Sequence, residues 1–371
     1  MAKIPADKDE IFYQLVLSKV EGVGVISARK LIKHFGTARE VLTLSTRDLM
    51  QVQGMSLGRA SAIGSFSGFD LIEREMEFAA ERGIRLLSFQ DPDYPRRLNH
   101  CADAPVVLFK RGNADLNASR MVSVVGTRRV TDYGKKVVRQ LIESFVPYGI
   151  TVVSGMAYGV DIEAHKTCLD FDLPTVGVLG HGLDRIYPNS HTRHASAMLE
   201  KGALLTEFTT NTEPDRENFP KRNRIVAGMT DATIVVESGF QGGSIITADL
   251  ANSYNRDVFA IPGRIDDEMS GGCNRLIKSN RAALLESVKD LEYIMGWKAS
   301  EEKQSVQKKL FVDLNPQEEV LVEFLREREK TQIDELSLGT GMPMSTVMVN
   351  LLNLELNGLV RALPGKVYEL C

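Results

Sequence analysis

The chain has 371 residues, of which 43% are hydrophobic and 25% charged. This composition is typical of globular proteins, and the length suits about two to four domains. No apolar run is long enough to cross a bilayer, and the first residues, MAKIPADKDE, lack the apolar segment of a signal peptide. The net charge of −4 excludes a general polycation, so binding to nucleic acid would have to come from local basic clusters.

The four cysteines are scattered and show no CxxC spacing: Cys101, Cys168, Cys273 and Cys371. This pattern argues against a structural zinc site and against a disulfide framework. We therefore expect a cytoplasmic protein that carries no metal and no other cofactor.

Residues 1–82 are predicted to form a small helical domain. A helix is expected at Ile11–Val20, and the turn Gly22-Val23-Gly24 precedes a second helix with apolar residues on one face. A degenerate copy of this turn and helix begins at Val52, and an amphipathic helix is expected at Phe69–Ala80. The pattern resembles a helix-hairpin-helix (SAM-like) domain, whose hairpin amides commonly contact a DNA phosphate. Such a bundle can also serve for packing alone, and the sequence leaves both roles open.

Short extended segments are predicted for residues 83–116. Strands are expected at Ile84–Phe89 and Val106–Phe109, with the turn-rich loop DPDYPRRL between them. Prolines argue against any helix in this segment: Pro92, Pro95 and Pro105. We expect these strands to lie beside the main sheet of the protein.

From Arg120 onward, strands and helices alternate. The expected strands are apolar on both faces: MVSVVG from Met121, Ile150–Ser154, Thr175–Leu179, ALLTEF from Ala203, Ala232–Val236 and Val258–Ile261. The helices expected between them include Lys135–Phe145, Ile162–Leu169, Thr192–Glu200 and Ile245–Tyr254. Buried strands that alternate with helices predict an α/β fold, a doubly wound, extended Rossmann-like parallel sheet over residues 83–297.

Ligands of such sheets bind at the carboxyl ends of the strands. Four turns with glycine or polar residues fall at those ends: Gly126-Thr127-Arg128, Ser154-Gly155, Gly180-His181-Gly182 and Gly239–Ser244. Glycines let a backbone approach a ligand closely, and free N–H groups at a helix start attract anions. The segment Phe219–Pro262 joins the last of these turns to the basic run Lys221-Arg222-Asn223-Arg224. It therefore predicts a phosphate site, with a plain βα turn and solvated arginines as the alternative.

A third domain is predicted at the C-terminal end. Residues 298–315 are largely polar and charged, without apolar periodicity, and are expected to be a linker. Residues 316–371 show a helix, a short helix, a longer helix and a two-stranded hairpin, the order found in a winged helix. The candidate recognition helix, PMSTVMVNLLNLELN, carries no lysine or arginine. This favours packing or a partner protein over contact with a major groove.

Two catalytic arrangements can be drawn from the sequence. Ser154, Asp161 and His165 could form a triad, but Asp161 and His165 are spaced i,i+4 on one helix, which favours capping and packing roles. His191 and His194 lack a third metal ligand at a recognisable spacing and are expected to be solvated. No catalytic residue and no metal site are therefore predicted.

Among the enzyme alternatives, a nucleotide-processing hydrolase has the more specific support in the sequence. The turn VVGTRRVTDYG fails as a dinucleotide fingerprint because Arg128 and Arg129 occupy positions that need glycine, and no P-loop is present. Phosphoribohydrolases that cleave nucleotide N-glycosidic bonds use a PGGxGTxxE loop at the same strand-to-helix turn. Here GFQGGSIITADLA keeps the glycines but has Ala248 and Asp249 near the expected acidic position. We expect a held phosphate without hydrolytic groups and keep a nucleotide-processing hydrolase as the alternative.

Several motifs follow one another in a recognisable order: VVGTRRVTDYG, VVSGMAYGVDIEAHK, LGHGLDRIYP, ENFPKRNRIVAG, and GGSIITADLA followed by FAIPG and GGCNRLI. Together they resemble the DNA-processing protein A (DprA/Smf) family, strongly over residues 83–297 and more weakly in the flanking modules. The resemblance implies an extended Rossmann domain that binds single-stranded DNA without cutting it and forms a homodimer. It further implies a non-enzymatic, sequence-independent binder that protects incoming DNA and loads its partner, the RecA recombinase, during natural transformation.

The resemblance also implies which residues bind DNA. One phosphate should be held by Gly126, Thr127 and Arg128, with Ser154 and Gly155 beside it, and by Gly242, Gly243 and Ser244 from the other side. The backbone should be contacted by Arg216, Lys221, Asn223 and Arg224. Phe219 should stack on a base.

The sequence departs from the family pattern in two places. The loop SGFQGGSIITA has Gly243 where the family usually has a serine, so only an amide donor remains there. Asn280-Arg281-Ala282 stands where the family usually has a glycine–alanine pair, which should matter little. The apolar run AALLESVKDLEYIMGW is expected to contribute to the dimer interface, with a purely intrachain core as the alternative.

Overall fold

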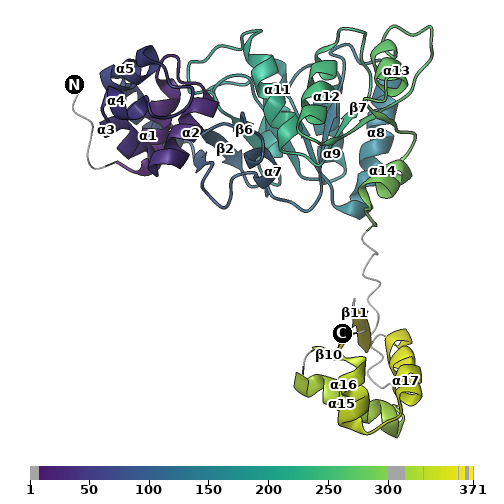
Figure 1. The fold of residues 1–371 in the computed structure, drawn as a ribbon. Coiled ribbons are helices and arrows are strands. Elements are labelled where there is room, and N and C mark those ends of the chain that lie inside the picture. The colour runs from purple at the N-terminus through teal and green to yellow at the C-terminus, as the bar shows by residue number, and fades with distance from the viewer. Residues whose placement is uncertain (1–7, 300–313, 329, 358, 364–366, 371) are drawn as a thin grey trace. The chain divides into compact units, whose positions relative to one another are not determined.

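The computed structural model describes residues 8–299, 314–328, 330–357, 359–363 and 367–370. They fall into two compact units, Met1–Ser300 and Glu301–Cys371 (Figure 1). Most of the linker predicted for residues 298–315 lies outside the described residues. Within the described part of the chain, no helix combines the length and the apolar character that crossing a membrane requires.

The first unit begins with a group of helices, purple and dark blue in Figure 1: α1 (Glu10–Lys19), α2 (Val25–Phe35), α3 (Ala38–Thr43), α4 (Thr46–Leu49), α5 (Leu57–Ser65) and α6 (Phe69–Glu81). The helices predicted on both sides of the first glycine turn are confirmed. Gly22 has a φ of 74°, a left-handed conformation that favours glycine at the bend. The short α3 and α4 were not expected, although Thr37 and Glu40 form a capping box that begins α3.

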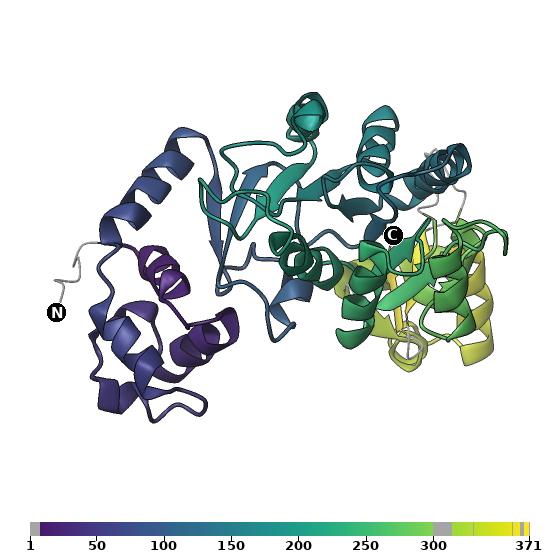
Figure 2. The ribbon, with the colours of Figure 1, turned by 90° about the horizontal axis from the view of Figure 1, so that it is seen from above.

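These helices are fixed to the sheet that follows them. The buried guanidinium of Arg29 donates to the backbone oxygens of Asn99 and Ala104, at 3.0 and 3.3 Å. The buried carboxylate of Glu75 accepts from the backbone N–H and the hydroxyl of Thr210. Figures 1 and 2 show the helices at the β1–β2 end of the sheet. Because both parts belong to one compact unit, the domain boundary after residue 82 stays a prediction.

The first unit is built on a nine-stranded sheet with the order β1-β2-β6-β5-β4-β3-β7-β8-β9. The strands are β1 (Arg85–Ser88), β2 (Val107–Gly112), β3 (Met121–Val125), β4 (Thr151–Ser154), β5 (Thr175–Val178), β6 (Ala203–Thr206), β7 (Ala232–Val235), β8 (Asp257–Ala260) and β9 (Ala283–Leu284). From β6 to β9 all pairs are parallel, whereas β1 and β2 add an antiparallel edge. The predicted extended parallel sheet is confirmed.

Helices cover both faces of the sheet: α7 (Arg96–Asn99), α8 (Asp132–Phe145), α9 (Val160–Asp170), α10 (Thr192–Met198), α11 (Asn218–Gly228), α12 (Gly243–Ser253), α13 (Gly271–Lys278) and α14 (Val288–Met295). Successive strand residues face opposite sides. Val124 belongs to a cluster with residues of α8 and α9, whereas Val125 belongs to the cluster with residues of α11 and α12. Hydrophobic residues on both strand faces therefore explain why the sheet is covered on both sides.

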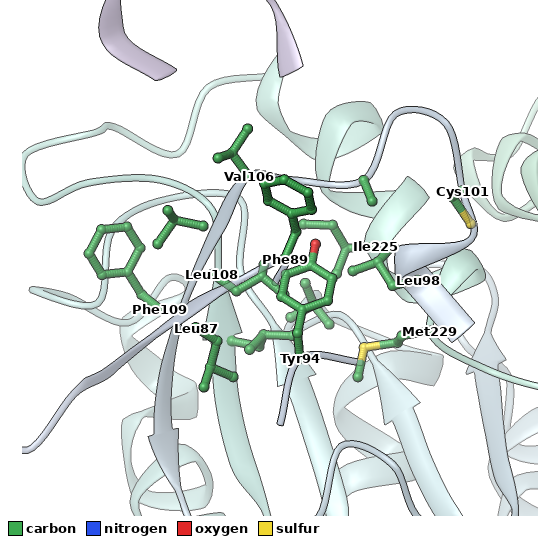
Figure 3. Packing of buried hydrophobic residues seen from close by; sticks show 14 of the residues in the cluster. Leu87, Phe89, Tyr94, Leu98, Cys101, Val106, Leu108, Phe109, Ile225 and Met229 are labelled. Carbon is green, nitrogen blue, oxygen red and sulfur yellow. The ribbon is translucent and has the colours of Figure 1, made fainter. Parts of the chain in front are cut away.

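Helix α7 corrects one prediction. Prolines were expected to exclude helix from residues 83–116, yet Pro95 is the N-cap of α7. A proline at a helix start lacks only an N–H that would be unpaired there. Figure 3 shows how this segment packs, with Tyr94 and Leu98 beside Ile225 and Met229. The hydroxyl of the buried Tyr94 donates to the oxygen of Pro105 at 2.7 Å, so the segment is fixed in the core.

The strand order reverses beside β3. The chain runs outward from β3 through β4 and β5 to β6, and then returns to place β7 on the other side of β3. In open α/β sheets, the crevice outside the carboxyl ends of the strands at such a reversal is the usual ligand site. The carboxyl ends of β3 and β7 are followed by the turns that begin at Gly126 and Val236.

The second unit has the predicted winged-helix order. It contains α15 (Pro316–Arg328), β10 (Lys330–Gln332), α16 (Ile333–Thr340), α17 (Met344–Leu356), β11 (Val360–Leu363) and β12 (Val367–Leu370). The strands pair as β10-β12-β11, of which β10 was not expected. Leu321, Leu336, Val347 and Leu351 are buried together in its core. Met348, Val349 and Leu352 of α17 are about half exposed or more, so part of the surface of the candidate recognition helix is apolar.

Candidate nucleic-acid interface

A hollow of about 450 Å³ lies at the reversal of the sheet, and we call it the switch-point hollow. It is lined by Val125, Gly126, Thr127, Arg128, Ala157, Arg216, Phe219, Pro220, Arg222, Asn223, Gly239, Gly242, Gly243, Ser244, Ile246 and Thr247. These residues come from the end of β3, from the turns after β3, β4 and β7, from the segment that leads into α11, and from the first turns of α11 and α12. The lining contains three arginines and no aspartate, glutamate, histidine or cysteine.

The turn after β3 forms one wall and is held rigidly. The N–H of Thr127 donates to the oxygen of Glu237 at 2.7 Å, and the Glu237 carboxylate accepts from the N–H and hydroxyl of Thr131. A side chain at Gly126 would overlap Val160, so only glycine fits there. The fixed backbone presents Arg128 at the surface, where its guanidinium lies 5.2 Å from the centroid of the Phe219 ring.

The glycine turn before α12 forms the opposite wall. Because α12 begins at Gly243, the N–H groups of Gly243 and Ser244 lack helical acceptors and can bind an anion, whereas the N–H of Ile245 donates to the oxygen of Gly242. Gly242 is crowded, since a Cβ there would overlap the Ser238 hydroxyl, whereas a Cβ at Gly243 would meet nothing within 4 Å. The Ser244 hydroxyl donates to Ser238 Oγ at 2.8 Å. The backbone of this turn, more than its side chains, therefore faces a ligand.

Arg222 of α11 lies at the floor of the switch-point hollow and is 5% exposed. Its guanidinium donates to the oxygen of Val178, at the end of β5, and to Asn223 Oδ1. The buried Asp161 interacts electrostatically with it; burial raises the pKa of Asp161 and the charge of Arg222 acts in the opposite direction. A side chain at Gly155 would overlap both groups, so this glycine makes room for the pair.

The predicted site residues separate into two groups. Those that line the switch-point hollow are Gly126, Thr127, Arg128, Arg216, Phe219, Asn223, Gly242, Gly243 and Ser244. The others are Ser154, Gly155, Lys221 and Arg224. Ser154 is buried and donates to the oxygen of Val124 at 2.6 Å. Lys221 is exposed on α11, and Arg224 is ion-paired with Glu207 and donates to the oxygen of Asp103.

Sequence reasoning assigned no DNA-contact role to Arg222, although helix periodicity contains the signal. Residues three and four apart share a helix face, so Phe219, Arg222 and Asn223 point the same way. Lys221 and Arg224 lie elsewhere on α11, outside the lining. The basic run therefore supplies one cation to the lining, Arg222, and only the helical periodicity distinguishes it from Lys221 and Arg224.

A smaller hollow of about 40 Å³ adjoins the first, and we call it the aromatic hollow. It is lined by Arg128, Met156, Ala157, Tyr158, Leu179, Gly180, His181, Tyr187, Pro188, Phe219 and Arg222. Arg128, Ala157, Phe219 and Arg222 therefore line both hollows. Tyr158 and Tyr187 are about half exposed, so flat apolar surface lies beside the cationic site.

The catalytic arrangements weighed from the sequence do not form. The two ring nitrogens of His165 lie 2.7 Å from Thr175 Oγ1 and 2.6 Å from the oxygen of Gly155, so the imidazole does not face Ser154. His191 was expected to be solvated but is buried, with Nδ1 2.9 Å from the oxygen of Met156. The described residues contain no group of three or more side chains that could hold a metal ion.

The acidic residue of the glycine turn also lies away from the switch-point hollow. Ala248 is buried, and Asp249 is ion-paired with Arg281 and does not line the hollow. Asn280, one of the departures from the family pattern, has a φ of 54°. Asparagine tolerates this left-handed conformation better than most residues, which explains how it replaces a glycine there.

Two family models match the chain over the parts just described. The model for DNA recombination-mediator protein A matches residues 85–295, and the model for the DprA winged helix domain matches residues 312–366. The chain belongs to the DprA family. It is 31% identical to Protein Smf of Synechocystis over 96% of this chain and 98% of that protein. It is also 33% identical to Protein Smf of Escherichia coli over 85% of each.

Solved structures of DprA proteins share the fold. The X-ray structure of DprA from Streptococcus pneumoniae is similar with a TM-score of 0.67 and 30% identity, over 79% of this chain and 99% of that one. DprA from Helicobacter pylori, described by its unique single-stranded DNA binding mode, gives a TM-score of 0.52 and 27% identity, over 57% of this chain and 95% of that one. The family and the fold inferred from the motifs are confirmed.

Proposed function

We propose that this DprA protein binds single-stranded DNA without sequence preference by holding backbone phosphates in the switch-point hollow. The observation that carries the proposal is the composition of the lining. Arg128, Arg216 and Arg222 supply cations, the start of α12 supplies amide donors, and no carboxylate opposes an anion. Arginine guanidinium groups and helix N-termini are both common phosphate ligands.

The surroundings of the hollow favour a single strand over a duplex. Phe219 lies beside the cationic lining, and Tyr158 and Tyr187 of the aromatic hollow are about half exposed. Aromatic rings stack on bases of any sequence, but only when the bases are not paired. The backbone contacts then give affinity and the rings give strand preference, without any group that reads base sequence.

We infer that the protein leaves its DNA chemically unchanged. The hollow offers hydroxyl groups on Thr127, Ser244 and Thr247, but its lining contains no carboxylate, imidazole or thiolate to activate them. A binder of this kind suits a mediator that protects incoming DNA and loads the RecA recombinase onto it, the role that the family implies. We include a homodimer through the Rossmann domain in this proposal, because Tyr293 and Ile294 of α14 expose apolar surface.

The test is strand binding by the full chain, measured by the fluorescence anisotropy of labelled oligothymidine. The variant Arg128→Gln/Arg216→Gln should weaken binding by a factor on the order of ten for each charge-assisted hydrogen bond that it removes. The matched control, Lys136→Gln/Lys278→Gln, removes two exposed charges that lie outside both hollows. Equal affinities of the two variants would refute the proposal. Release of free base from nucleoside monophosphates would instead support the hydrolase.

A further inference from the structure

A third hollow has a volume of about 510 Å³, and we call it the arginine hollow. Some of its lining residues are sequence neighbours of residues that line the aromatic hollow. It is lined by Arg82, Arg111, Leu183, Asp184, Arg185, Ile186, Asn189, Thr192, Ala195, Ser196, Leu199 and Leu204. Its three arginines come from separate places: Arg82 caps the end of α6, Arg111 lies on β2, and Arg185 lies in the loop between β5 and α10. Three cations from distant parts of the sequence thus meet around one depression.

The charges of this hollow are only partly compensated. Arg185 is ion-paired with Asp184 at 3.0 Å and with Glu213 at 2.6 Å. Arg82 and Arg111 have no hydrogen-bond or ion-pair partner among the described residues, and Arg82 only lies over the Phe78 ring at 5.3 Å. Two guanidinium groups therefore remain available to an anion. Their planar array of donors suits a phosphate group better than a point charge would.

Neutral donors complete the arginine hollow. The Thr192 hydroxyl donates to the backbone oxygen and to Oδ1 of Asn189, which leaves the amide nitrogen of Asn189 available. No hydrogen-bond partner of the Ser196 hydroxyl is found among the described residues, and Ser196 is exposed. The only carboxylate in the lining belongs to Asp184, and this carboxylate is already ion-paired with Arg185. The hollow is thus built for an oxyanion.

One loop connects the arginine hollow to the proposed DNA site. Gly180, His181, Tyr187 and Pro188 of residues 179–189 line the aromatic hollow, and other residues of the same loop, from Leu183 to Ile186 and Asn189, line the arginine hollow. Tyr187 of the aromatic hollow is 49% exposed and directly follows Ile186 of the arginine hollow in the sequence. A strand that leaves the switch-point hollow past Arg128 and Phe219 can therefore cross this loop and reach Arg82 and Arg111.

We propose that the arginine hollow is a second phosphate site, which holds a phosphodiester of the same strand further along its path. This inference rests on the proposed function, since the first phosphate is held in the switch-point hollow. It assigns a DNA-binding role to Arg82, at the end of the N-terminal helices, and to Arg111, on the antiparallel edge of the sheet. The protein then grips a strand at two points on either side of one loop.

The test compares strand lengths. Oligothymidines of about 4 and about 16 nucleotides span the range that single-strand modules occupy. The variant Arg82→Gln/Arg111→Gln should bind the short strand like the wild type and the long strand about tenfold more weakly. Its slope of log affinity against log salt, on the long strand, should be flatter by about 0.7 for one phosphate that is no longer bound. Neither side chain has a hydrogen-bond or ion-pair partner among the described residues, and Arg82 loses only its contact with the Phe78 ring, so the variant should fold normally. Lys136→Gln/Lys278→Gln is again the charge-matched control.

Three results would overturn the inference: wild-type affinity and slope on the long strand, an equal loss on the short strand, or an equal loss in the control. A further result that would overturn the inference concerns the source of the anion. If inorganic phosphate raises the melting temperature of the wild type but not of the variant, while long-strand binding is unchanged, the hollow takes a free anion and not the strand. Arg128→Gln separates this failure from that of the proposed function, because it should weaken both strand lengths whether or not the second site exists.

Discussion

The guanidinium of Arg128 lies 5.2 Å from the centroid of the Phe219 ring, and both residues line the switch-point hollow and the aromatic hollow. Arg128 follows β3, whereas Phe219 belongs to the first turn of α11. The stacked pair therefore joins two walls of the site across the reversal of the sheet. It places a cation and an aromatic surface side by side, the combination that a phosphate and its attached base need.

The contact between Arg128 and Phe219 leads to a prediction about the charge and the planar shape of the side chain at position 128. Arg128→Gln should weaken single-strand binding and flatten the slope of log affinity against log salt by about 0.7, because one phosphate is no longer neutralised. Arg128→Lys keeps the charge but not the planar group, so it should keep the slope and lose part of the affinity. Lys221→Gln, on the helix that carries Phe219, is the comparison, since Lys221 is exposed and lies outside the lining.

The measurement is a salt titration of anisotropy with labelled oligothymidine. Melting curves should show that each variant is folded. We expect the slope for Lys221→Gln to change less than the slope for Arg128→Gln. An unchanged slope in Arg128→Gln would mean that this arginine does not contact a phosphate, whatever its effect on affinity.

Adjacent glycines in the turn before α12 provide a second prediction. Gly243→Ser restores the residue that the family usually has, and a Cβ at this position meets nothing within 4 Å. The added hydroxyl at the edge of the hollow should strengthen strand binding by roughly two- to tenfold, the range of one hydrogen bond. Gly242→Ser is the matched change one residue earlier. Its Cβ would overlap the Ser238 hydroxyl, so it should disturb the turn and weaken binding.

Affinity and melting temperature measured on both variants decide the question. Gly243→Ser should melt like the wild type, whereas Gly242→Ser should melt lower. If the two serines weaken binding equally, the turn does not present its backbone to the strand in the way described.

The fold was predictable because its signals are local and repeated. Strands apolar on both faces, separated by helices with apolar periodicity, specify a covered parallel sheet whatever the details of its loops. Gly126 and the glycine turn before α12 predicted a ligand site at the carboxyl ends of β3 and β7, and the switch-point hollow lies there. The short α7 is not predictable from the prolines alone, because proline disfavours the interior of a helix but is accepted at a helix start, where Pro95 lies.

Individual side chains were harder to assign than the site. The basic run of α11 shows that cations are near, but long-range contacts decide where each one points. Arg224 is ion-paired with Glu207 of the segment after β6, and Arg222 donates a hydrogen bond to the oxygen of Val178 at the end of β5. Such pairings depend on segments that are distant in sequence and carry no local pattern. The arginine hollow could not be predicted from the sequence for the same reason, because Arg82, Arg111 and Arg185 come together only in the folded chain.

A buried histidine predicts how stability depends on pH. The His165 imidazole is fully buried, and because the oxygen of Gly155 can only accept, Nε2 carries the proton. Burial lowers the pKa of His165 from 6.5 to about 4. The unfolded chain then binds the extra proton at a higher pH than the folded chain. The stabilising contribution of neutral His165 is fully present above pH 6.5 and is lost as the pH falls towards 4, by about 3 kcal/mol.

The variant His165→Gln tests this, because it keeps an N–H donor near Gly155 but cannot titrate. Free energies of unfolding from denaturant titrations should be measured from pH 7.5 down to about pH 4. The difference between wild type and variant should shrink over this window, in favour of the variant as the pH falls. Parallel curves would show that His165 does not carry the pH dependence.

The last prediction concerns the oligomeric state. A single strand held by one or two phosphate contacts binds weakly at physiological salt. Two sites joined rigidly raise the effective concentration of the second contact and can strengthen binding by about a hundredfold. Tyr293 of α14 is 89% exposed, and Ile294 of α14 and Leu284 of β9 are each 42% exposed, so this end of the sheet offers apolar surface to a second copy. We expect a symmetric homodimer through this end, with the two switch-point hollows on one continuous path.

Light scattering at micromolar concentration should give twice the mass of the chain. Tyr293→Glu/Ile294→Glu should give the monomer mass, because two charges in an apolar interface are costly to bury. The variant should bind an oligothymidine of about 4 nucleotides like the wild type, since each hollow is intact, and long strands about a hundredfold more weakly. Lys278→Glu, an exposed change on α13, controls for added negative charge. A wild-type protein that is monomeric and still binds long strands as tightly would remove the dimer from the mechanism.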